Sequence, residues 1–183
     1  MARVSLLNKE QVDPAFREMY QRSEEQGREV LNVIKLIANC PQMGPEYFRF
    51  AGSVLRGENV PMKLRELATL RVGNLTGADY EFLHHIPLGV SAGLTRKQID
   101  DMGNWQTSSL FDEQERIVLR YTDEITRDNS VSDQTFSKLR EFFNEHDIVE
   151  LTLVIGYFIM LCRILVALRL ELEPGFKAET SSP

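Results

Sequence analysis

The sequence predicts an all-α protein, and three observations support this. Sustained alternation of apolar and polar residues is missing, as are the Asn-Gly and Asp-Gly turns typical of β-hairpins. Capping residues precede several apolar segments with helical spacing. Prolines open other such segments, where their fixed φ is tolerated. We therefore expect helices at 14–26, 30–39, 45–56, 61–75, 78–92, 95–103, 112–128, 132–145 and 147–170.

Most of these helices have a recognisable start. Prolines open the first, third and fourth helices, at Pro14, Pro45 and Pro61. Capping boxes open the sixth, seventh and ninth helices, at Thr95 to Gln98, Asp112 to Glu115 and Asp147 to Glu150. Ser132 is the expected cap of the eighth helix. A small turn at Thr76-Gly77 separates the fourth and fifth helices and leaves them antiparallel. Pro87 is expected to kink or break the fifth.

The last helix is apolar almost all round, with the sequence LTLVIGYFIMLCRILVALRLEL. Such a helix must be covered on most sides, either by its own core or by another subunit. A chain of 183 residues forms about one domain and rarely encloses a helix completely. We therefore expect a homo-oligomer.

Charge and targeting signals exclude several classes of partner. The chain has 21 Lys and Arg against 27 Asp and Glu, a formal net charge of −6. This balance repels phosphate backbones and anionic lipid, so no nucleic-acid or membrane partner is expected. The longest uncharged stretch, residues 151–162, is too short to span a bilayer. Because the N-terminus shows no signal peptide, a cytoplasmic location is expected.

The two cysteines, Cys40 and Cys162, lie far apart in the sequence among apolar neighbours. No CxxC and no cysteine–histidine ligand spacing exists, so we expect no metal site. Both thiols are expected to be reduced and buried.

The segment from Lys63 to His85 carries the candidate chemistry. Glu66 and His85 lie roughly 16 and 13 Å from the Thr76-Gly77 turn along their helices, at similar height. They can therefore face each other across the helix pair. Glu81 lies one turn before His85 on the same face. A carboxylate–imidazole–carboxylate cluster suits acid–base catalysis near neutral pH.

Structural roles stay open for the same side chains. Glu66 lies among basic residues and can be an ion-pair partner, and His85 can be a satisfied histidine at a helix end. His84 points about 100° away from His85 and is interpreted as a bystander. His146 is interpreted as structural.

Several short motifs together resemble the carboxymuconolactone decarboxylase family, whose fold is shared with alkylhydroperoxidase D. The motifs are Arg65-Glu66-Leu67, Arg71-Val72, Leu75-Thr76-Gly77, Tyr80-Glu81-Phe82, His84-His85 and Ala92-Gly93-Leu94-Thr95, with Glu150-Leu151, Ile155-Gly156-Tyr157, Met160, Arg163 and Ala167-Leu168 in the last helix. The resemblance implies an AhpD-like helical bundle with extra N-terminal helices: an extension at 1–44, the family domain at 45–172 and a flexible tail at 173–183. It also implies trimers or hexamers.

The resemblance distinguishes two chemistries. The peroxidase branch places two cysteines between its glutamate and histidine, and these positions are Ala78 and Glu81 here. Because thiol chemistry needs a thiolate, thiol peroxidase activity is disfavoured. The decarboxylase branch, which needs no cofactor, fits better. It implies a small carboxylate or lactone substrate, with His85 carrying the proton and Glu66 and Glu81 assisting it.

Further residues are expected to contact the substrate. Arg163 interrupts an apolar helix and needs a partner, which is either Glu66 or a substrate carboxylate. Arg71 is a second candidate cation, and Tyr80 and Tyr157 are candidate hydrogen-bond donors that more commonly pack in cores. The alternatives to a decarboxylase are an isomerase or hydratase using the same pocket, and a non-catalytic oligomeric binding or stress-response protein.

Overall fold

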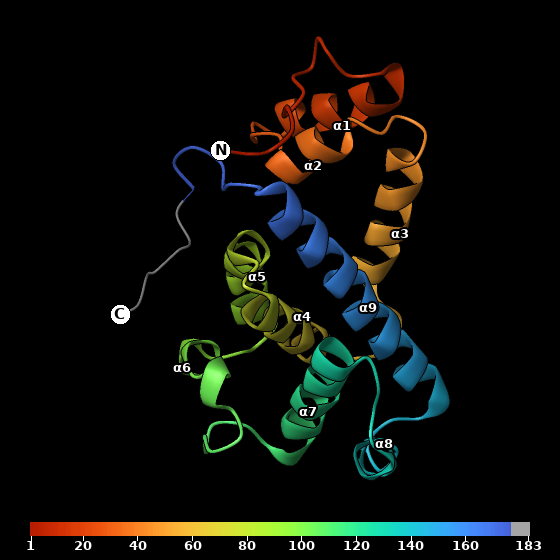
Figure 1. The fold of residues 1–183 in the computed structure, drawn as a ribbon, viewed down its shortest axis with the longest axis vertical. Helices are drawn as coiled ribbons and strands as arrows, with labels where there is room; N and C mark the ends of the chain where they lie inside the picture. Colours follow the sequence, from red (N-terminus) through yellow and green to blue (C-terminus); the bar gives the residue numbers. More distant parts are fainter. Residues whose placement is uncertain (177–183) are drawn as a thin grey trace. The chain divides into compact units, whose positions relative to one another are not determined.

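The computed structural model describes residues 1–176, and within that range it contains helices and no strand. The all-α prediction is therefore confirmed. The helices are α1 (Pro14–Glu25), α2 (Asn32–Ile37), α3 (Gly44–Arg56), α4 (Met62–Thr76), α5 (Asp79–Ser91), α6 (Arg96–Asp100), the 3₁₀ helix η1 (Met102–Asn104), α7 (Glu113–Asp128), α8 (Asp133–Leu139) and α9 (Glu145–Leu168) (Figure 1).

Three of the predicted helix caps are confirmed. Thr95 and Asp112 each form a complete capping box at the start of α6 and α7. Ser132 accepts the N–H of Thr135 at 3.2 Å and caps α8. These side chains satisfy backbone donors that have no partner within the helix.

Two predictions about helix limits are wrong. The helix expected at 132–145 ends at Leu139, and α9 begins at Glu145 instead of after Asp147. The reason is that Asn144 accepts the N–H of Asp147 at 3.0 Å and so provides the cap one turn earlier. Pro87 lies inside α5, which continues through it to Ser91.

The chain forms two compact units. Unit 1 comprises residues 1–56 and 165–176, and unit 2 comprises residues 57–164. In unit 1, a small core is built from Val12, Phe16, Tyr20, Val30 and Ala38. The predicted division after residue 44 does not coincide with these units and stays a prediction.

The last described residues of the chain are held within unit 1. Glu173 is buried and accepts the backbone N–H of Asn32 at 2.6 Å. Arg3 donates its backbone N–H to Leu168 at 2.9 Å. The remainder of the predicted tail, residues 177–183, lies outside the described residues.

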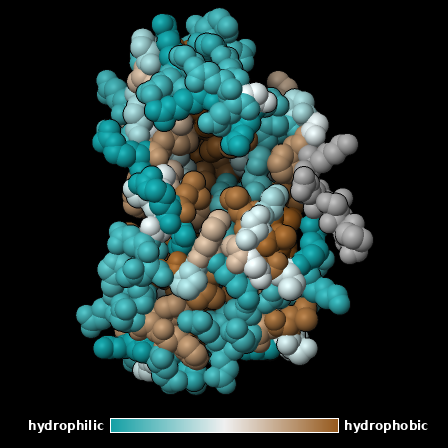
Figure 2. Space-filling model, turned by 180° about the vertical axis from the view of Figure 1, so that it is seen from behind, coloured by the Kyte–Doolittle hydropathy of each residue, from teal (hydrophilic) through white to brown (hydrophobic). Residues whose placement is uncertain are grey.

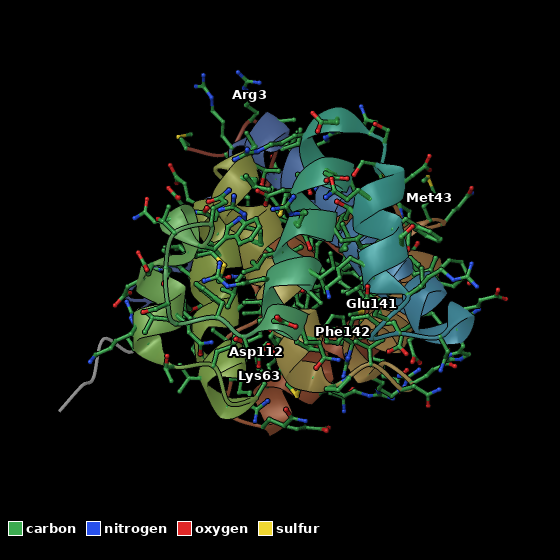
Figure 3. All side chains as sticks on the ribbon, turned by 90° about the horizontal axis from the view of Figure 1, so that it is seen from below. Arg3, Met43, Lys63, Asp112, Glu141 and Phe142 are labelled. Atoms are coloured by element: carbon green, nitrogen blue, oxygen red, sulfur yellow. The ribbon has the colours of Figure 1, made fainter. Side chains whose placement is uncertain are left out.

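Helix α4 is the central element of unit 2. Its residues 64–73 are all buried, and it packs against both α5 and α7 (Figure 1). Near the start of α4, Lys63 pairs with Glu115 of α7 at 2.6 Å, beside the capping residue Asp112 (Figure 3). Because α4 is enclosed on all sides, its polar residues must find partners inside the protein.

The turn between α4 and α5 explains their close approach. Gly77 ends α4 with φ at 65°, a left-handed conformation that glycine adopts without strain. Gly73 faces α5, where an added Cβ would lie 3.2–3.3 Å from atoms of Phe82. The two helices can therefore pack this closely only because residue 73 has no side chain.

Helix α9 is partly buried and partly exposed. Its length and mean hydropathy of 2.4 would suit a membrane span, yet 44% of its apolar window is buried inside the protein. Ile155, Phe158 and Cys162 lie on the buried side, whereas Val149 and Leu153 are more than half exposed. We therefore assign α9 as a core helix with an uncovered apolar face. Figure 2 shows hydrophobic side chains reaching the surface among hydrophilic ones.

Candidate active site

The structure brings Glu66, His85 and Glu81 together inside unit 2. His85 Nδ1 lies 2.7 Å from Glu66 Oε2, across the α4–α5 pair. His85 Nε2 lies 3.0 Å from Glu81 Oε1, one turn back along α5. All three residues are at least 94% buried. The geometry predicted from the spacing is confirmed, and the catalytic roles stay a prediction.

The imidazole of His85 is held in its charged form. Burial by itself lowers the pKa of His85, but the hydrogen bonds and negative charges of Glu66 and Glu81 outweigh burial and raise the pKa to about 9. Both ring nitrogens then donate, one to each carboxylate.

Helix α9 closes the cluster on an apolar side. The ring of Phe158 meets the imidazole of His85 edge-on, with 5.0 Å between ring centroids. Cys162, one turn later on α9, is fully buried. Such surroundings strengthen the electrostatic interactions within the cluster, because they exclude water.

The thiol nearest the cluster, Cys162, is not suited to nucleophilic chemistry. Burial, together with the negative charge of Glu81, raises the pKa of Cys162 to about 12. This thiol therefore remains protonated at neutral pH, although it neighbours the cluster. Cys40 is exposed, in unit 1. The prediction that both cysteines are buried is wrong for Cys40, because the short helix α2 ends before it.

Arg71 is not directed at the cluster, and its prediction as a substrate-binding cation is corrected. Its guanidinium bonds both carboxylate oxygens of Asp123 on α7, at 2.5 and 2.8 Å. It also donates to Asn74 and to the carbonyl of Met102. Arg71 is 1% exposed, so its charge is compensated within the core and serves the α4–α7 packing.

Arg163 is exposed on α9, so the desolvation argument for a buried partner does not hold. Within residues 1–176 it forms no ion pair, and Glu66 is engaged by His85 instead. It directly follows Cys162, which places its backbone close to the level of the cluster along α9.

The two predicted tyrosines are buried. The ring of Tyr80 packs on His84, with 4.5 Å between centroids. The ring of Tyr157 packs on Phe158 at 5.0 Å, beside the ring that contacts His85. Their predicted hydrogen bonds to a substrate stay a prediction.

A second histidine–carboxylate group lies at the start of α9. Ligand-type atoms of His146, Asp147 and Glu150 lie within 4.8 Å of one another. However, the Glu150 carboxylate accepts backbone N–H groups of Glu58, Asn59 and Val60 at 2.8–3.0 Å, and His146 Nε2 pairs with Glu58 at 2.9 Å. This agrees with the structural interpretation of His146.

Sequence reasoning missed Phe158 and Asp123. Nothing in the sequence indicated that Phe158 contacts the site, because aromatic residues are common in apolar helices. Asp123 interrupts the apolar face of α7 at a buried position, and a buried acid requires a cationic partner. An acidic residue on the apolar face of a helix can be recognised in the sequence, and it would have indicated Arg71 as the partner of Asp123.

Comparisons with solved structures define the class to which this fold belongs. The fold is similar to an AhpD-core, peroxidase-related protein of Ralstonia eutropha JMP134 (TM-score 0.81, 15% identity, 94% of this chain and 92% of that chain). It is also similar to the debrominase Bmp8, solved as a cysteine-to-alanine variant with 2,3,4-tribromopyrrole (TM-score 0.75, 19% identity, 94% of each chain). The fold is therefore AhpD-like.

The amino-acid sequence is also similar to known proteins. A protein of unknown function from Agrobacterium tumefaciens, proposed to be the antioxidant defence protein AhpD, is 25% identical (TM-score 0.70, 74% of this chain and 94% of that chain). No curated protein matches the chain. Residues 41–124 match the carboxymuconolactone decarboxylase family. Over residues 41–124 the chain is therefore similar to the carboxymuconolactone decarboxylase family, and its fold is AhpD-like.

Proposed function

We propose that this protein is a cofactor-independent enzyme that catalyses proton transfer at Glu66, His85 and Glu81, with decarboxylation of a small carboxylated lactone or carbonyl acid as its reaction. One observation carries the proposal: a buried histidine bonded to a carboxylate through each ring nitrogen, at 2.7 and 3.0 Å. A structural ion pair needs one carboxylate, whereas a proton relay uses both.

The roles follow from the two contacts. Glu66 holds Nδ1 and fixes the ring, while Glu81 receives a proton from Nε2 and delivers it to the substrate. In the reaction, the bond between carbon and the leaving carboxylate breaks and its electron pair moves into the conjugated carbonyl. Carbon dioxide leaves, and the proton from Glu81 is added to carbon. Solvent then reprotonates the pair.

Thiol chemistry is the less suitable alternative. Glu81 and Ala78 stand where the resemblance places cysteines, and Cys162 stays protonated because the pKa of its thiol is raised to about 12. A carboxylate therefore neighbours the imidazole where a peroxidase would need a thiolate.

The substrate's carboxylate requires a cation. Arg71 is committed to Asp123, which leaves Arg163 as the predicted residue for this contact. We propose that Arg163 binds the carboxylate and that Tyr157 and Tyr80 line the pocket.

The second carboxyl group of the cluster, that of Glu81 at 3.0 Å from His85 Nε2, favours a second candidate, an isomerase acting on a neutral carbonyl compound. Such a substrate avoids the repulsion that Glu81 exerts on an anion. Glu81 would then remove a proton next to the carbonyl and return it at another carbon. Product analysis separates the two reactions, because only decarboxylation releases carbon dioxide.

The exposed face of α9 supports a homo-oligomer. Val149, Leu153 and Met160 are 41–58% exposed and recur with helical spacing on one face. Arg163 follows Met160 on the same side. We propose that a second copy of the chain covers this face, as trimers or hexamers of the family fold would.

The proposal is tested first by binding. Small carboxylates and lactones are screened by thermal shift against the wild type, His85→Ala and the matched control His84→Ala, whose ring lies on Tyr80 outside the cluster. A ligand present at 100 times its Kd stabilises the protein by about 2.7 kcal/mol. We expect hits in the wild type and His84→Ala that are lost in His85→Ala.

Activity is then measured on those hits as release of carbon dioxide. We expect Glu81→Gln and Glu66→Gln to lower kcat by about 100-fold or more, since each removes part of the relay. Full activity in Glu81→Gln would overturn the mechanism, and hits retained by His85→Ala would move the site elsewhere.

A further inference from the structure

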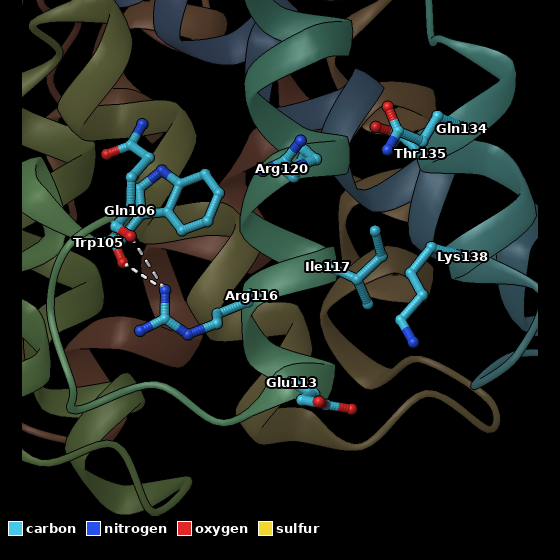
Figure 4. Close-up of a pocket in the computed structure, with 9 residues that line it drawn as sticks. All are labelled: Trp105, Gln106, Glu113, Arg116, Ile117, Arg120, Gln134, Thr135 and Lys138. Atoms are coloured by element: carbon cyan, nitrogen blue, oxygen red, sulfur yellow. Dashed lines mark hydrogen bonds between the residues drawn. The ribbon is translucent and has the colours of Figure 1, made fainter.

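A pocket lies on the outer side of α7, apart from the Glu66–His85–Glu81 cluster. It is a hollow of about 320 Å³ within unit 2, lined by Trp105, Gln106, Glu113, Arg116, Ile117, Arg120, Gln134, Thr135 and Lys138 (Figure 4). One face of α7 forms its floor, α8 one wall and the segment after η1 the other. Its volume lies within the range of small-molecule sites, about 300–1,000 Å³.

The wall formed by the segment after η1 is fixed before any ligand binds. Arg116 donates to the carbonyls of Trp105, Gln106 and Phe111 at 3.1–3.2 Å, and to that of Ser108. The indole of Trp105 is buried and donates to Asp123 at 3.2 Å. A preformed wall lowers the entropic cost of binding.

The lining holds three cationic side chains and one acidic side chain. Arg116 is bonded to carbonyls alone, and Arg120 makes no hydrogen bond or ion pair within the part of the chain that the structure describes. Glu124, four residues after Arg120, interacts electrostatically with Arg120 and is hydrogen-bonded to Ser132 and Thr135 at the start of α8. Lys138 pairs with Glu141 at 2.7 Å, and Glu113 is the only acid in the lining.

Apolar surface lies beside this charge. Ile117 lies between Arg120 and Glu113 along α7 and points towards α8, whereas Trp105 lies on the opposite wall, beside Gln106 (Figure 4). The exposed guanidinium of Arg120 keeps its hydrogen-bond donors available, and a guanidinium binds a carboxylate through two parallel hydrogen bonds. The neighbouring apolar surface would cover a flat hydrocarbon body.

We propose that this pocket binds a small organic acid with a flat apolar body, its carboxylate on Arg120 and its body between Ile117 and Trp105. This site is separate from the proposed catalytic cluster and does not depend on it. The chain's net charge of −6 makes a cationic pocket of this kind selective, because anions are repelled from most of the surface.

The chain offers a direct probe of this pocket, since Trp105 is its only tryptophan. Benzoate is titrated into the full chain while tryptophan emission is recorded, with benzyl alcohol as a neutral compound of similar size and inorganic phosphate as an anion without an apolar body. We expect a saturable change with benzoate and at least about tenfold weaker binding of the other two.

The variants separate this pocket from the catalytic site. Arg120→Gln should weaken benzoate binding by about tenfold or more, whereas Arg96→Gln, an exposed arginine on α6, should leave it unchanged. His85→Ala should also leave it unchanged, so failure of the catalytic proposal would not affect this test. The proposal is overturned by an unsaturable response, by unchanged binding in Arg120→Gln, or by equal binding of phosphate.

Discussion

His85 is a histidine whose charge is set by two neighbours and not by solvent. Glu66 and Glu81 lie on opposite sides of the ring and together overcome the burial that disfavours a cation. Spacing along α4 and α5 predicted this contact, since both residues lie at the same height above the turn. The protonation state of His85 could not be predicted from the sequence, because it depends on the burial of the ring and on its two hydrogen bonds.

The first prediction concerns the pH dependence of stability. Because the pKa of His85 rises from an unfolded value near 6.5 to about 9 on folding, the folded state binds more protons between these values. The stabilisation is complete below about pH 6.5 and is lost as pH rises through 9, amounting to about 3 kcal/mol. Urea unfolding at constant ionic strength between pH 6 and 10 measures it.

The matched variants for this experiment are His85→Gln and His146→Gln. The second removes an exposed histidine that pairs with Glu58 and should retain most of the pH dependence. Equal slopes for the wild type and His85→Gln between pH 6.5 and 9 would contradict the protonation state that we assign.

The second prediction concerns the buried pair of Arg71 and Asp123. Replacing Arg71 by Met leaves the Asp123 carboxylate buried without its partner, so the free energy of unfolding should fall by about 3–5 kcal/mol. Arg127→Met removes the exposed cation that lies 4.0 Å from the same carboxylate and should cost under about 1 kcal/mol. Denaturant unfolding compares them, and similar losses in the two variants would refute the assignment.

At the scale of elements, the packing of α4 on α5 positions the candidate site. We predict that Gly73→Ala lowers the free energy of unfolding by about 1–3 kcal/mol, because its methyl group would meet Phe82 at 3.2–3.3 Å. Gly103→Ala, where nothing lies within 4 Å, should be nearly neutral. Thermal unfolding measures both, and a neutral Gly73→Ala would show that the helices can separate without cost.

The sequence predicted the existence of every α-helix within residues 1–176, and local chemistry explains why. Caps such as Thr95 and Asp112 act through hydrogen bonds within three residues, so they can be read from the sequence. The start of α9 was misplaced because Glu150 also matched a capping box. Its carboxylate binds backbone N–H groups at residues 58–60 instead, and a contact between such distant residues leaves no local signal.

At the scale of the whole molecule, the apolar face of α9 leads to a prediction about assembly. Leu153→Lys should reduce the molar mass measured by light scattering without changing the helical circular dichroism, because it places a charge in the proposed interface. Leu110→Lys, another exposed leucine, is the control and should keep the wild-type mass. A monomeric wild type, or the same mass in all three proteins, would contradict the interface.

The sequence by itself determined the helical class, the α4–α5 pair and the opposition of Glu66 and His85, because these depend on caps, turns and helical spacing. Only the tertiary structure decided which charges are compensated: Arg71 by Asp123 in the core, Arg163 by solvent, and His85 by two carboxylates. Partner choice among charges depends on burial and on distances between residues remote in the chain. Both quantities are properties of the folded molecule.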